Sequence, residues 1–137
     1  MNASSGRSRG VAPCDLLAGA EALEWFVSSE RPLKRRPCLA GMFGFLNPLR
    51  ATPITLVSER ESEWIYSFSG PSLGDSPPFR GEDTVVVVLT DGLRPGPALQ
   101  SVCEQREIAL VKTGLSAEQM QDFLYARLPK VLTLKCV

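Results

Sequence analysis

The sequence predicts an α/β fold, with a mixed, partly parallel sheet and flanking helices in a single domain. Residues 85–89 are an unbroken run of four valines and a leucine, which is typical of a strand buried on both faces. A second short apolar run follows at 108–111, with one helical pattern between the two runs and another after them. Strand, helix, strand, helix is the parallel βαβ unit with one more helix, and its crossover is expected to be right-handed.

Two helices are expected around the second of these strands. The apolar side of the first helix holds Leu99, Val102 and Cys103. The second helix begins at Ser116, which forms a capping-box pattern with Gln119. Pro129 is expected to end it, because proline lacks an N–H and clashes with the preceding turn. The buried face of this helix is expected to hold Met120, Phe123, Leu124 and Leu128. A weak alternation in Val131–Val137 indicates a last strand.

The start of the chain is less regular. Residues 1–13, rich in Ser, Gly and Arg, are expected to be a disordered N-terminal tail, and residues 14–137 to form the single α/β domain. Composition favours a helix over Asp15–Phe26. The alternative is two short strands, Leu16–Ala18 and Trp25–Ser28, joined by a turn.

The middle of the chain predicts a strand, a helix and a loop in succession. Residues 54–57 have the β-branched and apolar composition of a short strand. Ser58 and Glu61 form a second capping-box pattern, which predicts a helix directly after that strand. Residues 69–83 contain three prolines and three glycines, and therefore predict an exposed loop.

Composition and charge exclude several classes of protein. The chain has 137 residues, 44% of them hydrophobic, which is enough for one domain with its own core. Lys and Arg number 15, as do Asp and Glu, so the chain lacks the excess positive charge on which non-specific nucleic-acid binding depends. No apolar run approaches the ~20 residues of a membrane span, and no signal peptide is present. We therefore expect a cytoplasmic protein that binds neither nucleic acid nor membrane.

The sequence contains no recognisable catalytic, metal or cofactor motif. Histidine is absent, which removes Ser-His-Asp and Cys-His catalysis and the commonest general base. Neither G-x-x-x-x-G-K-[ST] nor G-x-G-x-x-G occurs, so the chain has no P-loop for ATP phosphates. The four cysteines form no C-x-x-C pair and are expected to be reduced thiols. We expect no catalytic residue, no metal and no cofactor in this chain.

Two turns form the candidate ligand site. In open α/β sheets, ligands bind beyond the carboxyl ends of parallel strands, which are followed here by residues 90–92 and 112–116. Free N–H groups at the start of the next helix favour an anion, such as a phosphate or carboxylate. The candidate residues are Thr90, Asp91, Gly92, Lys112, Thr113 and Ser116, with Gly114 between the last two. The basic stretch Arg31–Arg36 is either a solvated loop or a further anion-binding loop.

Three blocks of the sequence resemble the N-terminal domain of bacterial HPr kinase/phosphorylase. Residues 17–23 resemble its L-A-G-E-x-G-L segment, and residues 36–43 with 54–57 resemble its R-P-G-L…A-G-[FY]-F and I-Q-L-L segments. Residues 84–128 resemble its strand, T-R-G-L-x-P-P turn, helix, strand and helix, although Asp91 stands where that turn has arginine. The family's domain is an α/β unit similar to the UDP-binding N-terminal domains of Mur ligases. The resemblance favours the two-strand alternative for residues 15–26.

The resemblance implies a non-catalytic regulatory or assembly domain. In that family a separate C-terminal domain with a P-loop phosphorylates and dephosphorylates a serine of the phosphocarrier HPr. This chain would then act in the bacterial phosphotransferase system and carbon catabolite repression. Its partners would be a kinase domain in cis or in trans, HPr or a sister subunit. The alternative is a free-standing module that binds an anionic small molecule, either a phosphorylated metabolite or a nucleotide.

Overall fold

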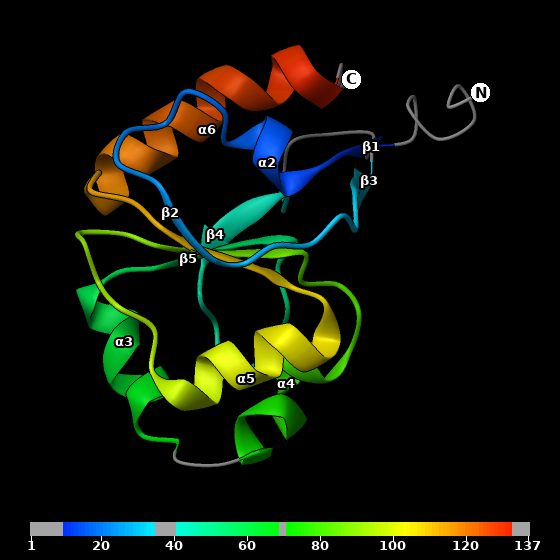
Figure 1. The fold of residues 1–137 in the computed structure, drawn as a ribbon, viewed down its shortest axis with the longest axis vertical. Helices are drawn as coiled ribbons and strands as arrows, with labels where there is room; N and C mark the ends of the chain where they lie inside the picture. Colours follow the sequence, from blue (N-terminus) through cyan, green and yellow to red (C-terminus); the bar gives the residue numbers. More distant parts are fainter. Residues whose placement is uncertain (1–9, 35–40, 69–70, 133–137) are drawn as a thin grey trace.

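A mixed five-stranded sheet lies at the centre of the fold (Figure 1). The computed structural model describes residues 10–34, 41–68 and 71–132. In sheet order the strands are β2 (Glu24–Val27), β7 (Ala109–Lys112), β6 (Val86–Leu89), β5 (Ile54–Val57) and β4 (Phe43–Phe45). The last four are parallel to one another, whereas β2 is antiparallel to β7. The expected α/β class, with a mixed and partly parallel sheet, is confirmed.

Helices cover both faces of this sheet (Figure 1). One face carries α6 (Ala117–Leu132) and the short α2 (Pro13–Leu16). The opposite face carries α3 (Glu59–Tyr66), the 3₁₀ turn η1 (Pro71–Asp75), α4 (Pro77–Arg80) and α5 (Pro97–Arg106). A separate antiparallel pair, β1 (Gly10–Val11) and β3 (Leu33–Lys34), lies beside α2 and the end of α6.

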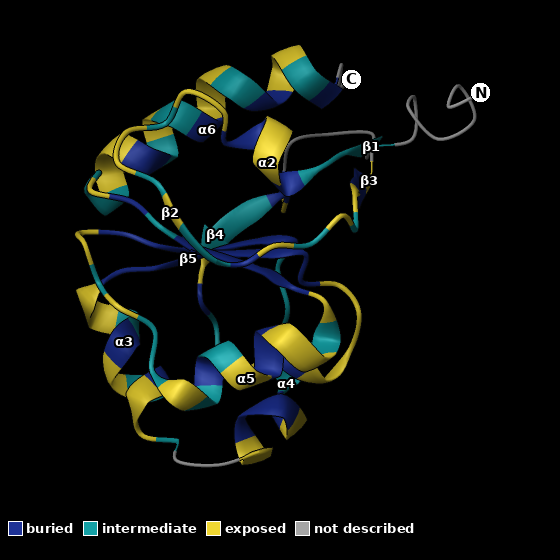
Figure 2. Ribbon diagram, viewed as in Figure 1, coloured by how far each residue is buried: buried dark blue, intermediate teal, exposed yellow. Residues whose placement is uncertain are grey.

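The three inner strands are buried on both faces, as the valine run predicts (Figure 2). Their side chains alternate between two clusters because successive residues of a strand point to opposite faces. Val86 and Val88 join the cluster beneath α6, with Leu124 and Leu128. Val87 and Leu89 join the cluster beneath α5, whose members include Leu99, Val102 and Cys103. The expected apolar sides of both helices therefore face the core, although Phe123 is only half-buried.

The predicted strand Leu16–Ala18 is wrong, and the predicted tail is too long. Pro13 begins α2, since proline is well suited to the first turn of a helix, and Leu16 is fully buried in the cluster beneath α6. Gly10–Val11 pair with β3, so the last residues of the predicted tail belong to the fold, while residues 1–9 lie outside the described ranges. The second predicted strand is confirmed as β2, shifted by one residue.

The predicted exposed loop at 69–83 is also wrong over most of its length. Residues 71–75 form η1, and residues 77–80 form α4. The prolines do not prevent this, because Pro71 begins η1 and Pro77 and Pro78 occupy the first turn of α4, where a missing N–H costs nothing. Phe79 is fully buried against the sheet, so this segment is part of the core.

The last helix does not end at Pro129. α6 continues to Leu132, which is fully buried, so tertiary packing favours the extra turn. The carbonyl that loses its partner N–H at Pro129 belongs to Tyr125, an exposed residue four positions earlier. The first two residues of the predicted strand Val131–Val137 therefore belong to α6, and the rest lie outside the described residues.

Both predicted capping boxes are present. The backbone N–H of Ser58 donates to Oε1 of Glu61 at 2.9 Å. The backbone N–H of Ser116 donates to Oε1 of Gln119 at 2.9 Å, and the N–H of Gln119 donates to Oγ of Ser116 at 3.2 Å. These bonds satisfy N–H groups that have no partner within the helix.

We expect Ser116→Ala to lower the free energy of unfolding by about 1 kcal/mol, because the Gln119 N–H loses its acceptor. Urea denaturation followed by circular dichroism measures this change. Ser101→Ala is the matched control, since Ser101 is exposed in the middle of α5, where alanine is the better helix former. Equal losses for the two variants would contradict the cap at Ser116.

Candidate functional site

The structure brings together the two turns that the sequence predicts to bind an anion. Residues 90–92 follow β6, and residues 113–116 follow β7, its parallel neighbour. The N–H of Asp91 donates to the Leu115 carbonyl at 2.8 Å, and the N–H of Gly92 donates to the Thr113 carbonyl at 3.0 Å. Asp91 and Gly92 both adopt left-handed backbone conformations, with φ of 58° and 72°. The turns are therefore bonded directly to each other.

The donors expected to bind the anion already have partners within the chain. The Thr113 hydroxyl donates to the Glu21 carbonyl at 2.6 Å, and the Thr90 hydroxyl lies 3.3 Å from the Val57 carbonyl and 3.0 Å from Oδ2 of Asp91. Both threonines are fully buried. Lys112 forms an ion pair with Glu24, with 3.6 Å between Nζ and Oε1. An anion between the turns would have to replace some of these bonds, and its binding there stays a prediction.

Two further backbone N–H groups of this region are also occupied. The Ser116 N–H is bound by Gln119, and the Leu115 N–H donates to the Thr113 hydroxyl at 3.2 Å. Gly114 does allow a close approach, but the neighbour is protein: a Cβ atom at this position would lie 3.2 Å from Cβ of Ala22. The glycine thus serves packing between the turn and the segment before β2.

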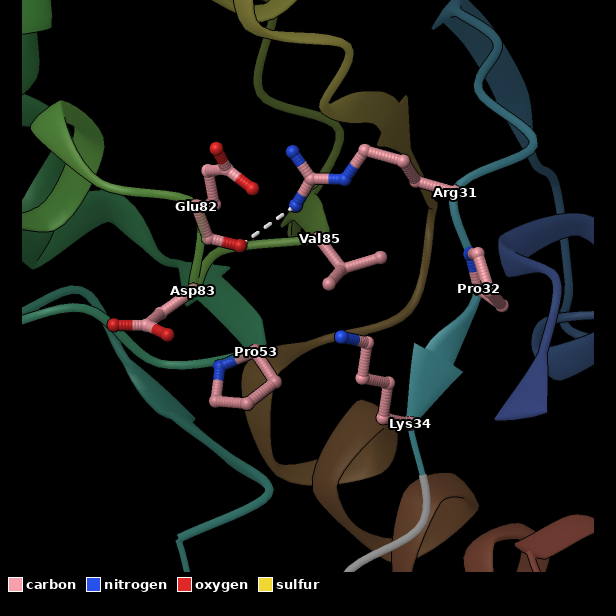
Figure 3. A pocket seen from close by; sticks show the side chains of 7 residues that line it. All are labelled: Arg31, Pro32, Lys34, Pro53, Glu82, Asp83 and Val85. Carbon is pink, nitrogen blue, oxygen red and sulfur yellow. Dashed lines mark hydrogen bonds between the residues drawn. The ribbon is translucent and has the colours of Figure 1, made fainter. Parts of the chain in front are cut away.

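A cavity that we name the basic cavity, after Arg31 and Lys34 in its lining, lies at the opposite end of the strands, at the amino ends of β5 and β6 (Figure 3). Its volume is about 400 Å³, which falls within the usual range of small-molecule sites. The lining residues are Arg31, Pro32, Lys34, Pro53, Glu82, Asp83 and Val85. Pro53 and Val85 directly precede β5 and β6, and Lys34 belongs to β3. Of the basic stretch Arg31–Arg36, the last two residues lie outside the described ranges.

Two cationic side chains face this cavity (Figure 3). The Lys34 side chain extends into it toward Val85, and the Arg31 guanidinium faces it from another side. The Asp83 carboxylate points away from Lys34. Lys34 is exposed and makes no ion pair or side-chain hydrogen bond with any other described residue. The lining therefore carries two cationic side chains, Arg31 and Lys34, together with the carboxylates of Glu82 and Asp83.

The Arg31 guanidinium is held firmly at the cavity wall. Nη1 donates to the Arg106 carbonyl at 3.1 Å, and Nη2 donates to the carbonyls of Glu82 and Thr84, each at 2.9 Å. The backbone N–H of Arg31 donates to the Ser29 hydroxyl at 3.1 Å, and this hydroxyl donates to the Glu107 carbonyl at 2.8 Å. Since a guanidinium has five N–H donors, two remain for a ligand.

The cysteine that is buried in α5 is poorly suited to act as a nucleophile. Cys103 is fully buried, and burial raises the pKa of its thiol, which opposes formation of a thiolate nucleophile. No group of three or more Cys, Asp or Glu side chains within the described ranges could hold a metal ion. No helix in the same ranges is long and apolar enough to cross a bilayer.

Comparison with known proteins finds a solved structure with a similar fold but no matching sequence family. No protein-family model matches the sequence, and a search of curated proteins finds no match. Among solved structures, the chain is similar to the CBS and DRTGG domains of the regulatory region of Clostridium perfringens pyrophosphatase, complexed with the activator diadenosine tetraphosphate. The identity is 13% and the TM-score 0.52, over 89% of this chain and 47% of that one. The chain thus spans about half of that structure's length.

These findings define the chain as a small α/β domain with a fold found in a pyrophosphatase regulatory region, and they correct the resemblance drawn from the sequence. The resemblance to HPr kinase/phosphorylase is wrong: no family model supports it, and the fold similarity is to CBS and DRTGG domains. The expected partners HPr and a kinase domain, and a role in the phosphotransferase system or catabolite repression, lose their support with it. The matched blocks are short apolar and glycine-containing segments, and residues 17–23, for example, form only the turns between α2 and β2.

Proposed function

We propose that this chain is a non-catalytic regulatory module that binds a phosphate-bearing small molecule of the nucleotide class in the basic cavity. The observation that carries the proposal is the pair of cationic side chains, Arg31 and Lys34, that face one cavity of about 400 Å³. The fold supports the regulatory role, because the similar pyrophosphatase domains belong to a regulatory region complexed with diadenosine tetraphosphate. This ligand is an activator of that protein and is a candidate class for this one.

The physical chemistry of the cavity favours an anion. Hydrogen bonds from a charged donor to a phosphate oxygen are about twice as strong as neutral ones. The Arg31 guanidinium is already fixed by three carbonyls, so little conformational entropy is lost when its remaining N–H groups bind a ligand. Lys34 then supplies a mobile point charge that can follow the position of the phosphate.

The basic cavity is a better candidate than the two turns beyond β6 and β7. At the turns, Lys112 is paired with Glu24 and the hydroxyls are bonded to backbone carbonyls. At the cavity, Lys34 has no partner among the described side chains, so a ligand need not displace an existing ion pair. An anion at Lys112, in contrast, has to compete with the Glu24 carboxylate for the same ammonium group.

We expect Lys34→Ala to raise the Kd for a phosphate-bearing ligand by about tenfold or more, since loss of a charge-assisted hydrogen bond costs about 1.5–3 kcal/mol. Isothermal titration calorimetry of the full chain at fixed, low ionic strength measures this with ATP, ADP, diadenosine tetraphosphate and inorganic phosphate as probes. Lys112→Ala is the matched control, because it removes the same charge from the other candidate site, and its Kd is expected to match that of the unchanged chain.

The two lysine variants also separate the alternatives. If Lys112→Ala weakens binding and Lys34→Ala does not, the ligand binds between the turns and the basic cavity is excluded. If none of the four probes binds the unchanged chain at millimolar concentration, the proposed function itself is refuted.

A further inference from the structure

The Arg106 side chain binds the η1–α4 segment at three backbone carbonyls. Its Nη1 donates to the carbonyls of Phe79 and Arg80 at 2.9 and 3.0 Å, and its Nη2 donates to the Gly74 carbonyl at 3.0 Å. The last carbonyls of a helix have no partner within that helix. Arg106 therefore satisfies carbonyls at the end of α4 and in η1 from its own position at the end of α5.

Arg31 in turn holds the backbone from which the Arg106 side chain extends. It binds the Arg106 carbonyl through Nη1, and through Nη2 it binds the carbonyls of Glu82 and Thr84, which connect α4 to β6. The next residue, Glu107, has a left-handed backbone conformation with φ of 57°, and its carbonyl accepts the Ser29 hydroxyl. A continuous chain of hydrogen bonds thus leads from the cavity, through Arg31 and Arg106, to η1 and α4.

We infer that Arg31 and Arg106 couple occupancy of the basic cavity to the stability of the η1–α4 segment. The inference rests on the proposed function and names its means of regulation. A phosphate held by Lys34 and the remaining N–H groups of Arg31 fixes the guanidinium where it binds three carbonyls. Local openings of the segment that carry away the Glu82 and Thr84 carbonyls disturb this arrangement. The ligand therefore disfavours such openings, and the surface of η1 and α4 becomes more rigid when the cavity is filled.

Amide hydrogen exchange of the full chain, measured by NMR, tests the coupling without any ligand. The reporters are the N–H groups of Ser76, Phe79 and Arg80, which are bonded within η1 and α4. Arg106→Ala removes direct contacts and is expected to speed their exchange several-fold. Arg31→Ala is expected to do the same although the Arg31 guanidinium binds carbonyls outside η1 and α4. Arg31→Lys, which loses the fork of donors, is expected to be intermediate. Unchanged exchange in Arg31→Ala would overturn the coupling.

A second experiment measures amide hydrogen exchange of the unchanged chain in the presence of ATP. With ATP at about ten times its Kd, exchange of the three reporters is expected to slow by up to about tenfold, because openings that lose the site are suppressed by the factor 1 + [L]/Kd. The Met120 N–H, at the start of α6, is expected to keep its rate. In Arg106→Ala, ATP is still expected to bind by calorimetry, but the slowing at Ser76, Phe79 and Arg80 is expected to be smaller, because only the Glu82 and Thr84 carbonyls then connect Arg31 to the segment.

The outcomes keep the two claims apart. Binding of ATP with no change at the reporters overturns the coupling and leaves the proposed function standing. If ATP does not bind, the proposed function fails for that ligand, and the ligand-free comparison of Arg31→Ala with Arg60→Ala still decides the coupling. Arg60 is exposed and makes no side-chain hydrogen bond in the described part of the chain, so its variant provides the baseline.

Discussion

Phe79→Ala is expected to lower the free energy of unfolding by about 3–5 kcal/mol. Phe79 is fully buried, and it lies in the cluster that includes Leu73, Leu99 and Val102. Truncation to alanine removes an aromatic ring from this cluster and leaves a cavity, because the sheet and α5 fix the surrounding atoms. Urea denaturation followed by tryptophan fluorescence measures the change.

Phe68→Ala is the matched control for this variant. Phe68 belongs to the edge of the same cluster but is only partly buried, stacked edge-to-face on Trp64 with 4.8 Å between ring centroids. Its truncation is expected to cost clearly less than that of Phe79. An exposed loop at 71–80 would give a change within about 0.5 kcal/mol for Phe79→Ala, so a small effect would contradict the packing of α4 against the sheet.

The parts of the fold that the sequence predicted well are those determined by local pattern. The valine run at 85–89 contains β6, which is buried on both faces. An unbroken apolar run of this kind is typical of a central strand. The caps at Ser58 and Ser116 could be predicted from the sequence because the two residues of each capping box lie three positions apart on the same turn. Such signals need no knowledge of what lies on the far side of the sheet.

The parts that were predicted wrongly depend on tertiary contacts that override local preference. Pro129 is unfavourable inside a helix, yet α6 continues because the next turn buries Leu132. The prolines at 71, 77 and 78 suggested a loop, but each stands at the start of a short helical turn. The bonds from Arg106 to η1 and α4 span 26 to 32 residues, and no local pattern reveals them.

The candidate site also has features that the sequence predicted and features that depend on distant contacts. The sequence predicted that residues 90–92 and 113–116 lie side by side, because they follow two adjacent parallel strands. The sequence did not predict that the Thr113 hydroxyl and the Lys112 ammonium group already have partners. These partners are Glu21 and Glu24, which lie about 90 residues away in sequence. The position of Lys34 at the cavity depends on pairing between two-residue strands, with Gly10 opposite Lys34. Strands this short leave no periodicity to detect, so the sequence left Arg31–Arg36 open between a solvated and an anion-binding loop.

Leu124→Ala is expected to lower the free energy of unfolding by about 2–5 kcal/mol. Leu124 lies at the centre of α6 and is fully buried against Val86, Val88 and their neighbours on the face of the sheet opposite Phe79. The helix is anchored by Met120 one turn before and Leu128 one turn after, so it cannot move inward to fill the space. The lost contacts are therefore not recovered by relaxation, which places the cost within the range for rigid cores.

The matched control for Leu124→Ala is Leu49→Ala, because Leu49 is 82% exposed and undergoes the same chemical change. Its effect is expected to stay within about 0.5 kcal/mol, as for a surface substitution. Urea melts of both variants, with equal m-values to show that the denatured states are comparable, give the difference directly. If Leu124→Ala is as mild as Leu49→Ala, the face of α6 assigned to the core is wrong. If Leu124→Ala is costly, the packing of α6 against its face of the sheet depends on this side chain, as the packing of α4 on the opposite face depends on Phe79.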